Sequence, residues 1–504
     1  MEQESSSTPE SSDATEASTP RKRAPRRVSS ASTEPKASAE KPADAQASDK
    51  PAADAAPAEE GERPKRRRQS SAAKSPEGEK TESQESNDST DEPAEGGQSR
   101  SRNGGNSRGR GRDRRRGRGG YGEDGEPEVS DDDVLIPIGG ILDVLDNYAF
   151  VRTQGYLPGP TDVYVSLGQV KKYNLRKGDA VIGAIRQPRE GEHQGRQKYN
   201  ALVSVDTVNG QTVDEAAARS EFQNLQAVYP TEQLRMETTS DALGTRMVDL
   251  FAPVAKGQRA VVAGAPKTGK SELIHAMAQA VAVNAPDAHL MVVLIDEQPE
   301  TISEVQREAK GEVIASSFDR SVDDHTTIAE LAIERAKRLV ELGHDVVVLV
   351  DSLTRLARAY QLSIGGGSRS GSADTAWVYP TKKLFGAARN VEGGGSLTMV
   401  ATVVTDTGIA MDDVVASEVS GAATMELALS AEAAGARVFP AFDIARSGTR
   451  KEELILGSDQ AVAVASLRQK LVGSPAVEGL QNLASKLAGT SSNVEALVAL
   501  PKSL

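Results

Sequence analysis

The sequence predicts an α/β fold built on a parallel sheet, preceded by a small closed β-barrel and by a long N-terminal extension. From residue 259 onward, short apolar runs alternate with stretches of helical periodicity, which is typical of parallel sheets covered by helices. Between residues 134 and 209, short strand-like runs recur between turn signals, which favours a barrel such as the OB-fold. Before residue 134 the apolar periodicity is lost, which indicates a segment without a packed core.

The composition excludes several classes of protein. The 504 residues contain no cysteine, so disulfides and thiolate metal sites are excluded and a reducing, intracellular setting is favoured. The five histidines do not fall at metal-ligand spacing. Because neither a signal-peptide pattern nor an apolar run of membrane-spanning length occurs, we expect a cytoplasmic protein with no membrane partner. The formal net charge of −13 does not exclude nucleic acid, since the local distribution of charge decides that.

Residues 1–133 are expected to be disordered. Ser, Thr, Glu, Ala and Pro dominate this segment, so it cannot bury enough apolar surface to offset the entropy of ordering. Towards its end, between Arg100 and Tyr121, arginines alternate with Gly, Ser and Asn. Such a flexible polycation can contact phosphates and stack on bases, although a solubilising tail without a partner is the alternative.

The barrel, expected over residues 134–210, carries a candidate surface for unpaired bases. Tyr148, Phe150 and Arg152 are two residues apart, so on a strand they share one face. Rings on an exposed face would form a stacking platform, whereas rings facing inward would be barrel core, and the pattern leaves both possibilities open. Tyr164, Lys198 and Tyr199 could extend the platform. Residues 211–256 form a polar connector with a weak pattern.

The strongest motif is a glycine-rich loop between Gly264 and Ser271 that fits G-x-x-x-x-G-K-[ST]. It follows an apolar run and precedes an alanine-rich helical stretch, which is the context this motif requires. Backbone amides would surround phosphate oxygens, Lys270 would reach the β and γ phosphates, and the Ser271 hydroxyl would bind Mg²⁺. The predicted nucleotide-binding residues here are Gly264, Ala265, Pro266, Lys267, Thr268, Gly269, Lys270, Ser271 and Glu272.

Two further predicted strands end in acidic residues. The run at 290–297 ends in Asp296 and Glu297, and the run at 345–351 ends in Asp351. Because parallel strands end at one edge of a sheet, we expect these carboxylates beside the glycine-rich loop. Asp351 has the Walker B pattern and is predicted to bind Mg²⁺, while Glu297 can orient and activate an attacking water. Taken singly, each acid is equally well explained as a helix cap or a solvated strand end.

The domain at 257–504 also supplies cations. Arg437 and Arg450 follow the last predicted sheet strand, and the γ-phosphoryl group requires positive charge from the side opposite the loop. An arginine this far along the chain either faces a neighbouring subunit or is an ordinary surface charge, and the pattern does not decide between the two. After Gly457 the chain is expected to be mostly helical.

From about Val134 to Leu504 the sequence resembles the bacterial transcription termination factor Rho family. The matching stretches are GAPKTGKS, LIDE, VDSLTRLARAY at 350–360, FGAARN at 385–390 and RSGTRKEEL at 446–454, of which the last three are specific. The resemblance implies a RecA-like ATPase domain, assembled as a homohexameric ring with ATP between subunits. It also implies an RNA-dependent ATPase and 5′-3′ RNA/DNA helicase that binds cytosine-rich nascent single-stranded RNA and releases it from the RNA polymerase elongation complex.

The resemblance also implies roles for particular residues. Lys267, Lys270 and Ser271 would hold phosphates and Mg²⁺, with Glu297 activating water and Asp351 as the Walker B acid. Arg450 would act as an arginine finger on the neighbour's nucleotide, Arg437 would assist it, and Phe439 would pack on the adenine. The family's primary RNA site falls at Tyr148, Phe150, Arg152, Tyr164, Lys198 and Tyr199, and Arg369 is expected to contact RNA in the central channel.

The chain departs from the family pattern at two informative positions. Gln298 stands where many relatives carry Arg, which is expected to soften communication around the catalytic Glu. Ser420 stands where a Lys-Gly-Thr-Gly segment usually supplies a lysine, which is expected to weaken the grip on RNA. Two rival functions remain open on the sequence: a rotary-type or recombinase-type ATPase, and a protein that coats RNA while ATP regulates its assembly.

Overall fold

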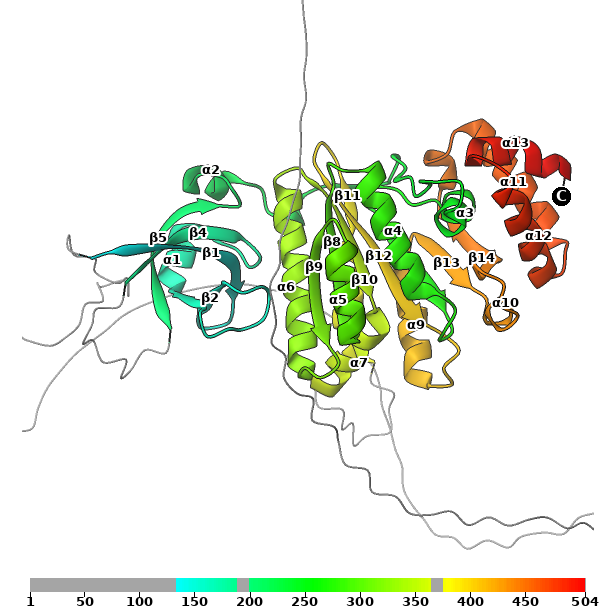
Figure 1. Ribbon diagram of the computed structural model, residues 1–504. Helices are drawn as coiled ribbons and strands as arrows, with labels where there is room; N and C mark the ends of the chain where they lie inside the picture. Colours follow the sequence, from blue (N-terminus) through cyan, green and yellow to red (C-terminus); the bar gives the residue numbers. More distant parts are fainter. Residues whose placement is uncertain (1–132, 188–198, 364–374, 504) are drawn as a thin grey trace, which may run out of the picture. The chain divides into compact units, whose positions relative to one another are not determined.

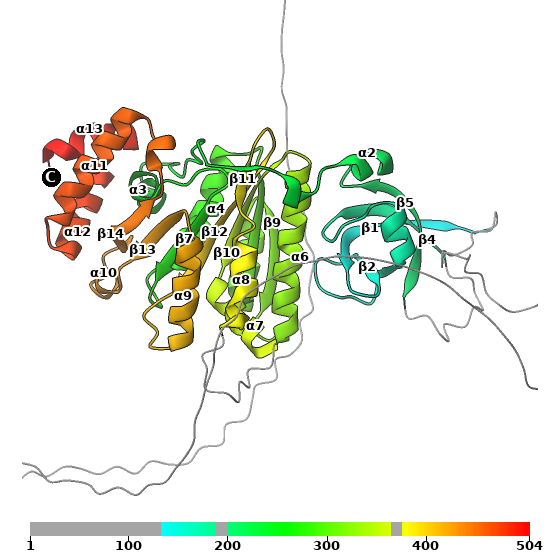
Figure 2. The same ribbon diagram turned by 180° about the vertical axis from the view of Figure 1, so that it is seen from behind.

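The structure is a computed structural model in which residues 133–187, 199–363 and 375–503 are described. These residues form a closed five-stranded barrel and a nine-stranded sheet flanked by helices (Figure 1 and Figure 2). In that part of the chain, no helix combines the length and the apolar character needed to cross a bilayer.

The barrel confirms the small closed barrel expected from the sequence. Its strands, in the order β1-β2-β3-β5-β4, are β1 (Leu135–Val144), β2 (Ala149–Arg152), β3 (Val163–Val165), β4 (Ala180–Arg186) and β5 (Asn200–Val208). Helix α1 (Leu167–Lys172) follows β3 and begins with a capping box in which the Ser166 side chain accepts the Gln169 amide. Gly140 permits closure, because a Cβ there would lie 2.1 Å from the Arg152 carbonyl oxygen.

The large sheet has the strand order β14-β13-β7-β12-β10-β8-β9, with β6 and β11 paired at one side. Its central pairs are parallel, and the pair of β13 with β14 is antiparallel. The strands are β6 (Ala227–Val228), β7 (Arg259–Gly264), β8 (His289–Glu297), β9 (Glu312–Ser317), β10 (Asp345–Asp351), β11 (Arg389–Val391), β12 (Ser396–Val404), β13 (Met425–Leu429) and β14 (Phe442–Thr449).

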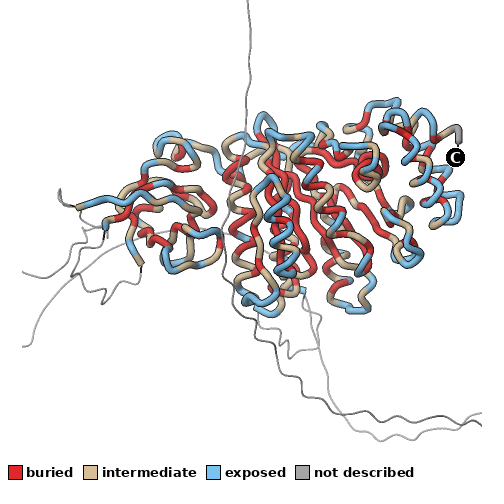
Figure 3. Tube along the Cα trace, viewed as in Figure 1, coloured by how far each residue is buried: buried red, intermediate tan, exposed pale blue. Residues whose placement is uncertain are grey.

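Both faces of the sheet are buried, as expected for parallel strands between helices (Figure 3). Successive residues of β7 face opposite layers: Val261 packs with one core cluster, and Ala260 and Val262 pack with the other. The first layer consists of α6 (Val322–Glu341), α7 (Leu353–Ser363), α8 (Tyr379–Phe385) and α9 (Ala410–Ala422). The second contains α3 (Leu243–Phe251), α4 (Lys270–Asn284), α5 (Pro299–Glu308), α11 (Ser458–Val472), α12 (Ala476–Ala488) and α13 (Asn493–Ser503).

Shorter elements complete the fold. They are α2 (Val213–Ala218), α10 (Ala431–Gly435) and the 3-10 turns η1 (Phe222–Asn224), η2 (Ala376–Val378) and η3 (Glu452–Leu454). The helical stretch expected after Gly457 is present as α11, α12 and α13.

Helix α3 lies inside the segment that the sequence presented as a polar connector. Seven of its nine residues, from Thr245 to Phe251, are buried, and its apolar side chains belong to the core of the sheet domain. The helix was missed because nine residues give only two and a half turns of periodicity, and polar sequence surrounds them.

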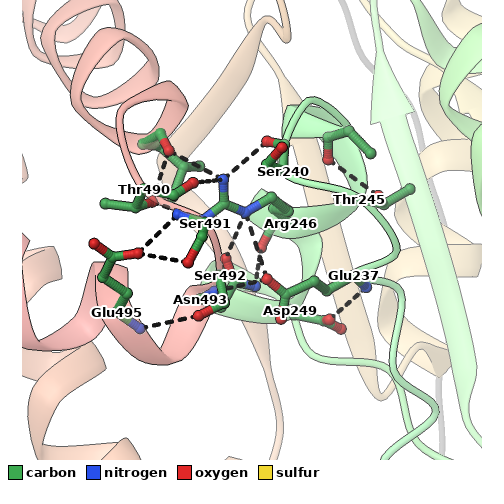
Figure 4. Close-up of polar contacts among 12 residues, drawn as sticks. Glu237, Ser240, Thr245, Arg246, Asp249, Thr490, Ser491, Ser492, Asn493 and Glu495 are labelled. Atoms are coloured by element: carbon green, nitrogen blue, oxygen red, sulfur yellow. Dashed lines mark hydrogen bonds and ion pairs between the residues drawn. The ribbon is translucent and has the colours of Figure 1, made fainter.

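A buried arginine joins α3 to the end of the chain (Figure 4). The Arg246 guanidinium, with no exposed surface, donates to the backbone carbonyls of Ser240, Leu487 and Thr490. It also donates to the side chains of Thr490 and Asn493. Leu487 lies in the last turn of α12 and Thr490 lies two residues beyond its end, so Arg246 donates to carbonyls at the C-terminus of the helix, where intrahelical donors run out.

Replacing Arg246 by Met is therefore expected to destabilise the fold strongly. The thioether would leave the carbonyls of Ser240 and Thr490 and the amide oxygen of Asn493 without the donor that Arg246 supplies, at about 1 kcal/mol or more each. The free energy of unfolding should therefore fall by about 3 kcal/mol or more. Urea denaturation followed by circular dichroism measures this. The matched control is Arg235→Met at an exposed position, which should change stability by about 0.5 kcal/mol or less; equal stabilities of the two variants would contradict the prediction.

Candidate nucleotide site and nucleic-acid surface

The glycine-rich loop has the strand-loop-helix form that the motif predicts. Strand β7 ends at Gly264, and α4 begins at Lys270 directly after Gly269, whose φ of 92° is left-handed. Gly264 has no room for a side chain, because a Cβ there would lie 2.8 Å from the Thr268 hydroxyl and 2.9 Å from Leu429. The loop is thus held close to the neighbouring strand β13, with its amides at the N-terminus of a 15-residue helix.

The hydroxyl of Ser271 and the carboxylate of Asp351 meet at this edge. Ser271 Oγ donates to Asp351 Oδ2 at 2.6 Å, and Thr402 Oγ1 donates to Asp351 Oδ1 at 2.6 Å. Asp351 is only 4% exposed at the end of β10. Thr402, on the intervening strand β12, was not predicted; the one signal was a threonine within an apolar run.

This oxygen pair fits Mg²⁺. Hard divalent cations take oxygen ligands, and Mg²⁺ usually keeps waters and phosphate oxygens beside one or two protein groups. A hydroxyl and a carboxylate oxygen 2.6 Å apart, next to a phosphate-binding loop, supply that minimal set. Among the described residues, no cluster of three or more His, Cys, Asp or Glu offers a self-sufficient metal site.

The Lys270 ammonium bonds to the loop itself. Its Nζ donates to the carbonyls of Gly264 at 2.8 Å and Ala265 at 2.7 Å. Burial, opposed by the attraction of Asp351 and assisted by the nearby Arg355 cation, lowers the pKa of Lys270 to about 8.

ATP affinity is therefore expected to depend on pH through Lys270. A bound triphosphate stabilises the ammonium and raises its pKa, so above pH 8 binding must take up a proton that the free protein has lost. The affinity should be constant from pH 7 to 8 and then fall by about tenfold per pH unit. Titration of a fluorescent ATP analogue from pH 7 to 9.5 measures this. Lys270→Arg, charged throughout, should remove the pH dependence, and a flat wild-type profile would contradict the assignment.

Glu297 ends β8 at the same edge, as predicted, but it has a partner that the sequence did not predict. Its carboxylate accepts the Gln298 amide at 3.0 Å and forms an ion pair with Arg355 of α7. Burial alone would lower the pKa of Arg355, but the hydrogen bond and charge of Glu297 raise it. Arg355 lies four residues after Asp351, within the stretch 350–360 that carried the family resemblance, and that was the available signal.

A cavity of about 700 Å³ adjoins the loop. Its walls are the loop residues Lys267, Thr268 and Gly269, the stretch 241–244 at the start of α3, and Phe439 with the residues after it. Phe439 is 48% exposed, and its ring lies 3.9 Å from where a Cβ of Gly269 would be. A half-exposed ring over an apolar cavity beside the loop is suited to packing on a nucleoside base.

The two candidate arginines lie at opposite ends of the parallel strands. The Arg450 amide donates to the Thr424 carbonyl, and the Thr424 amide donates to the carbonyl of Arg259, the first residue of β7. The glycine-rich loop begins at the other end of β7, about 16 Å away for five residue steps. Arg437 instead follows α10, two residues before Phe439, at the edge where Leu429 pairs with Gly264.

The barrel rings gather on its outer face. Phe150 lies at their centre, with ring centroids 5.6 Å from Tyr148, 6.0 Å from Tyr164 and 4.9 Å from Tyr199, all edge to face. Its neighbours Ala149 and Val151 point into the barrel core, and Tyr148 is 45% exposed. The alternative that these rings form the barrel core is therefore wrong. Lys198 and Arg369 lie outside the described residues.

Arg152 does not continue this exposed face, contrary to expectation. It is 5% exposed, and its guanidinium donates to Asp143 and to Asp162 at 2.7 Å. Two carboxylates on neighbouring segments draw the last side chain of β2 inward, which sequence alternation does not reveal. Burial would lower the pKa of Arg152, but the hydrogen bonds and charges of these two acids raise it. The guanidinium lies 5.4 Å from the Phe150 ring centroid, so it underlies the aromatic cluster.

Comparison with known proteins agrees with this arrangement. Residues 138–214 match the family model "Rho termination factor, RNA-binding domain", and residues 244–449 match "ATP synthase alpha/beta family, nucleotide-binding domain". A protein of Streptosporangium roseum named transcription termination factor Rho is 45% identical over 364 residues, which cover 72% of this chain and 91% of that protein. The chain belongs to the Rho family.

Other relatives of the same name extend the comparison. The Rho factor of Streptomyces lividans is 54% identical over 379 residues, covering 75% of this chain and 53% of that protein. The Rho factor of Borreliella burgdorferi is 43% identical over 370 residues, covering 72% and 71%. The chain thus spans about half the length of the Streptomyces relative, and 64% of that from Mycobacterium tuberculosis. A solved ATPase from the type III secretion system of pathogenic bacteria is similar at 23% identity over 52% of this chain and 83% of its own, with a TM-score of 0.44.

Proposed function

We propose that this chain is an RNA-dependent ATPase and 5′-3′ RNA/DNA helicase that acts in the cytoplasm. It binds cytosine-rich nascent RNA, moves along it by hydrolysing ATP, and releases it from RNA polymerase. The observation that carries the proposal is the contact of Ser271 with Asp351 beside a phosphate-binding loop, in a chain whose barrel exposes an aromatic cluster. The names of its relatives agree with it.

The residues at the sheet edge divide the chemistry between them. The loop amides and Lys270 bind phosphate oxygens, and Ser271 and Asp351 would hold Mg²⁺, which would neutralise phosphate charge when bound. Glu297 accepts a proton from the attacking water. Because its carboxylate pairs with Arg355 in this structure, the water must compete with that guanidinium for Glu297. Release of Arg355 is thus a step at which RNA binding can control hydrolysis.

The position of Arg450 supports an assembly of several copies. The residue lies near the start of β7, and the loop begins about 16 Å along that strand, so Arg450 cannot reach a nucleotide bound at its own loop. A second copy that places its loop against this edge would receive the guanidinium. Repeating that contact around a closed ring gives the homohexamer proposed for this chain.

The aromatic cluster supports binding of single strands. Each base stacked on an aromatic side chain contributes about 1–3 kcal/mol, and every unpaired base offers a face for it. Phe150 and the three tyrosine rings around it form a compact surface that favours the smaller pyrimidine rings.

One assay tests the proposal: ATP turnover measured without polynucleotide and with RNA and DNA homopolymers. Turnover should be low alone and rise most with poly(C) RNA. Equal rates with and without RNA would contradict it and favour a rotary-type or recombinase-type ATPase. RNA binding without stimulated turnover would favour the RNA-coating alternative.

Replacing Phe150 by Ala is expected to weaken RNA binding by about tenfold, because one stacking surface and the centre of the cluster are lost. Turnover at saturating RNA should be retained, since the ATP site is untouched. Fluorescence anisotropy with labelled oligo(C) measures the affinity. Ile182→Ala is the control, because Ile182 is an exposed apolar residue of the same barrel on β4. Equal affinities of the two variants would argue against the aromatic cluster as the RNA site.

A further inference from the structure

Strand β8 contains an irregularity directly before Glu297. In its pairing with β9, Ile295 lies opposite Ser316 and Glu297 lies opposite Ser317, so Asp296 is an extra residue with no partner. Its φ of 55° is in the left-handed region, which is unfavourable for a residue with a side chain. A bulge of this kind redirects the side chains that follow it. The direction in which Glu297 points is thus set at Asp296.

A buried histidine spans this bulge. His325, in the first turn of α6, is 6% exposed, and its Nδ1 lies 2.6 Å from the hydroxyl of Ser316, which is also buried. Its Nε2 lies 3.9 Å from Asp296 Oδ1. The ring therefore contacts the residue of β9 opposite the start of the bulge and the bulged residue itself. The ring is thus hydrogen-bonded to Ser316 and packed against the Asp296 carboxylate, and it restrains the bulge from both sides.

A backbone hydrogen bond fixes Glu297, the residue directly after the bulge. The Glu297 carbonyl accepts the amide of Phe318 at 3.0 Å, and this bond closes the irregular stretch on the side of β9. His325 contacts neither Glu297 nor the glycine-rich loop among the interactions of the described residues. Any influence it has on the reaction acts through Asp296.

We infer that His325 is a positioning residue that fixes the Asp296 bulge and thereby aims the Glu297 carboxylate at the attacking water. The inference rests on the proposed ATPase function for its catalytic consequence. Loss of the ring frees Asp296 to leave the left-handed conformation, and Glu297 then points away from the phosphates for part of the time. The rate of the chemical step falls, while the loop and the cavity that bind ATP are unchanged.

The experiment compares three substitutions of His325 in the full chain. His325→Leu removes both contacts, His325→Asn keeps an amide near the position of Nδ1, and His325→Gln carries its amide towards the position of Nε2. His325→Leu should lower kcat for RNA-stimulated turnover at least tenfold and leave the Kd for ATP within threefold. His325→Gln should recover more of kcat than His325→Asn. His344→Gln, at an exposed histidine after the same helix, should match the wild type.

A second variant covers the case in which His325→Leu does not fold. Asp296 has a side chain 42% exposed, so Asp296→Ala should fold. It removes the carboxylate that faces His325 and a side chain that tolerates the left-handed region, and should show the same split between kcat and Kd. Hydrogen exchange of residues 294–298 should be faster than in the wild type for each variant, whether or not the protein turns over ATP. If the wild-type protein shows no RNA-stimulated turnover, the proposed function is overturned. The hydrogen exchange of the variants would then be the measurement that tests this inference. Unchanged exchange in the variants, or unchanged kcat in a folded Asp296→Ala protein, would overturn it.

Discussion

Replacing Glu297 by Gln is expected to reduce ATP turnover by about 10²-fold or more while ATP binding is retained. The amide has the size of the carboxylate and can still accept the Gln298 amide, but it cannot take a proton from water, and general-base catalysis contributes about 10²–10⁴-fold. The substitution also removes the ion pair with Arg355, so the measured loss includes whatever that pair contributes to turnover. Phosphate release at saturating poly(C) measures turnover, and a fluorescent ATP analogue measures affinity.

The control for Glu297→Gln is the same change at Glu300, an exposed residue in the first turn of α5. Glu300→Gln should keep wild-type turnover. A Glu297→Gln protein that hydrolyses ATP normally would move the general base to another group. A protein that no longer binds ATP would show that Glu297 has a structural role in the site.

Replacing Arg450 by Ala is expected to lower turnover by about 10³-fold, the smaller end of what arginine fingers contribute. The reason is its distance from its own loop, which leaves a neighbouring copy as the only nucleotide within reach. Arg446→Ala is the control, because Arg446 is an exposed arginine of β14, the strand that ends directly before Arg450. Steady-state turnover of the purified variants gives the comparison.

A mixing experiment decides whether Arg450 acts within its own subunit or on the next. Subunits with Arg450→Ala keep Glu297, and subunits with Glu297→Gln keep Arg450. When the two are unfolded and refolded together, some contacts between copies combine both intact residues, so turnover should exceed that of either variant alone. Activity that stays at the level of the separate variants would place Arg450 in its own subunit's site.

The sequence predicted the parts of the site that depend on local order along the chain. A loop between a strand and a helix, and acids at the ends of apolar runs, need only the rule that parallel strands end together. Charge pairing could not be predicted in the same way. Arg355 reaches Glu297, and Arg152 turns inward to Asp143 and Asp162, because of how separate segments pack. Period-two alternation assigned Arg152 to the surface, and buried carboxylates overrode it.

The residues that line the cavity could not be predicted from the sequence for a related reason. Residues 241–244 line the space beside the loop, yet they lie at the start of a helix too short to give a clear periodic signal. Thr402, which orients Asp351, lies within an apolar run where a hydroxyl has no local explanation. Both depend on contacts between residues far apart in the chain.

The hydrogen bonds from Arg246 to the end of α12 connect the C-terminal helices to the cavity in which a nucleoside base would bind. Residues 241–244, which form a wall of that cavity, are followed directly by the turn of α3 from which Arg246 reaches Leu487 and Thr490. The C-terminal helices therefore support the wall of the nucleotide pocket at residues 241–244, although none of their side chains lines the pocket. Shortening these helices or weakening their packing would lower the affinity for ATP before it destabilised the barrel.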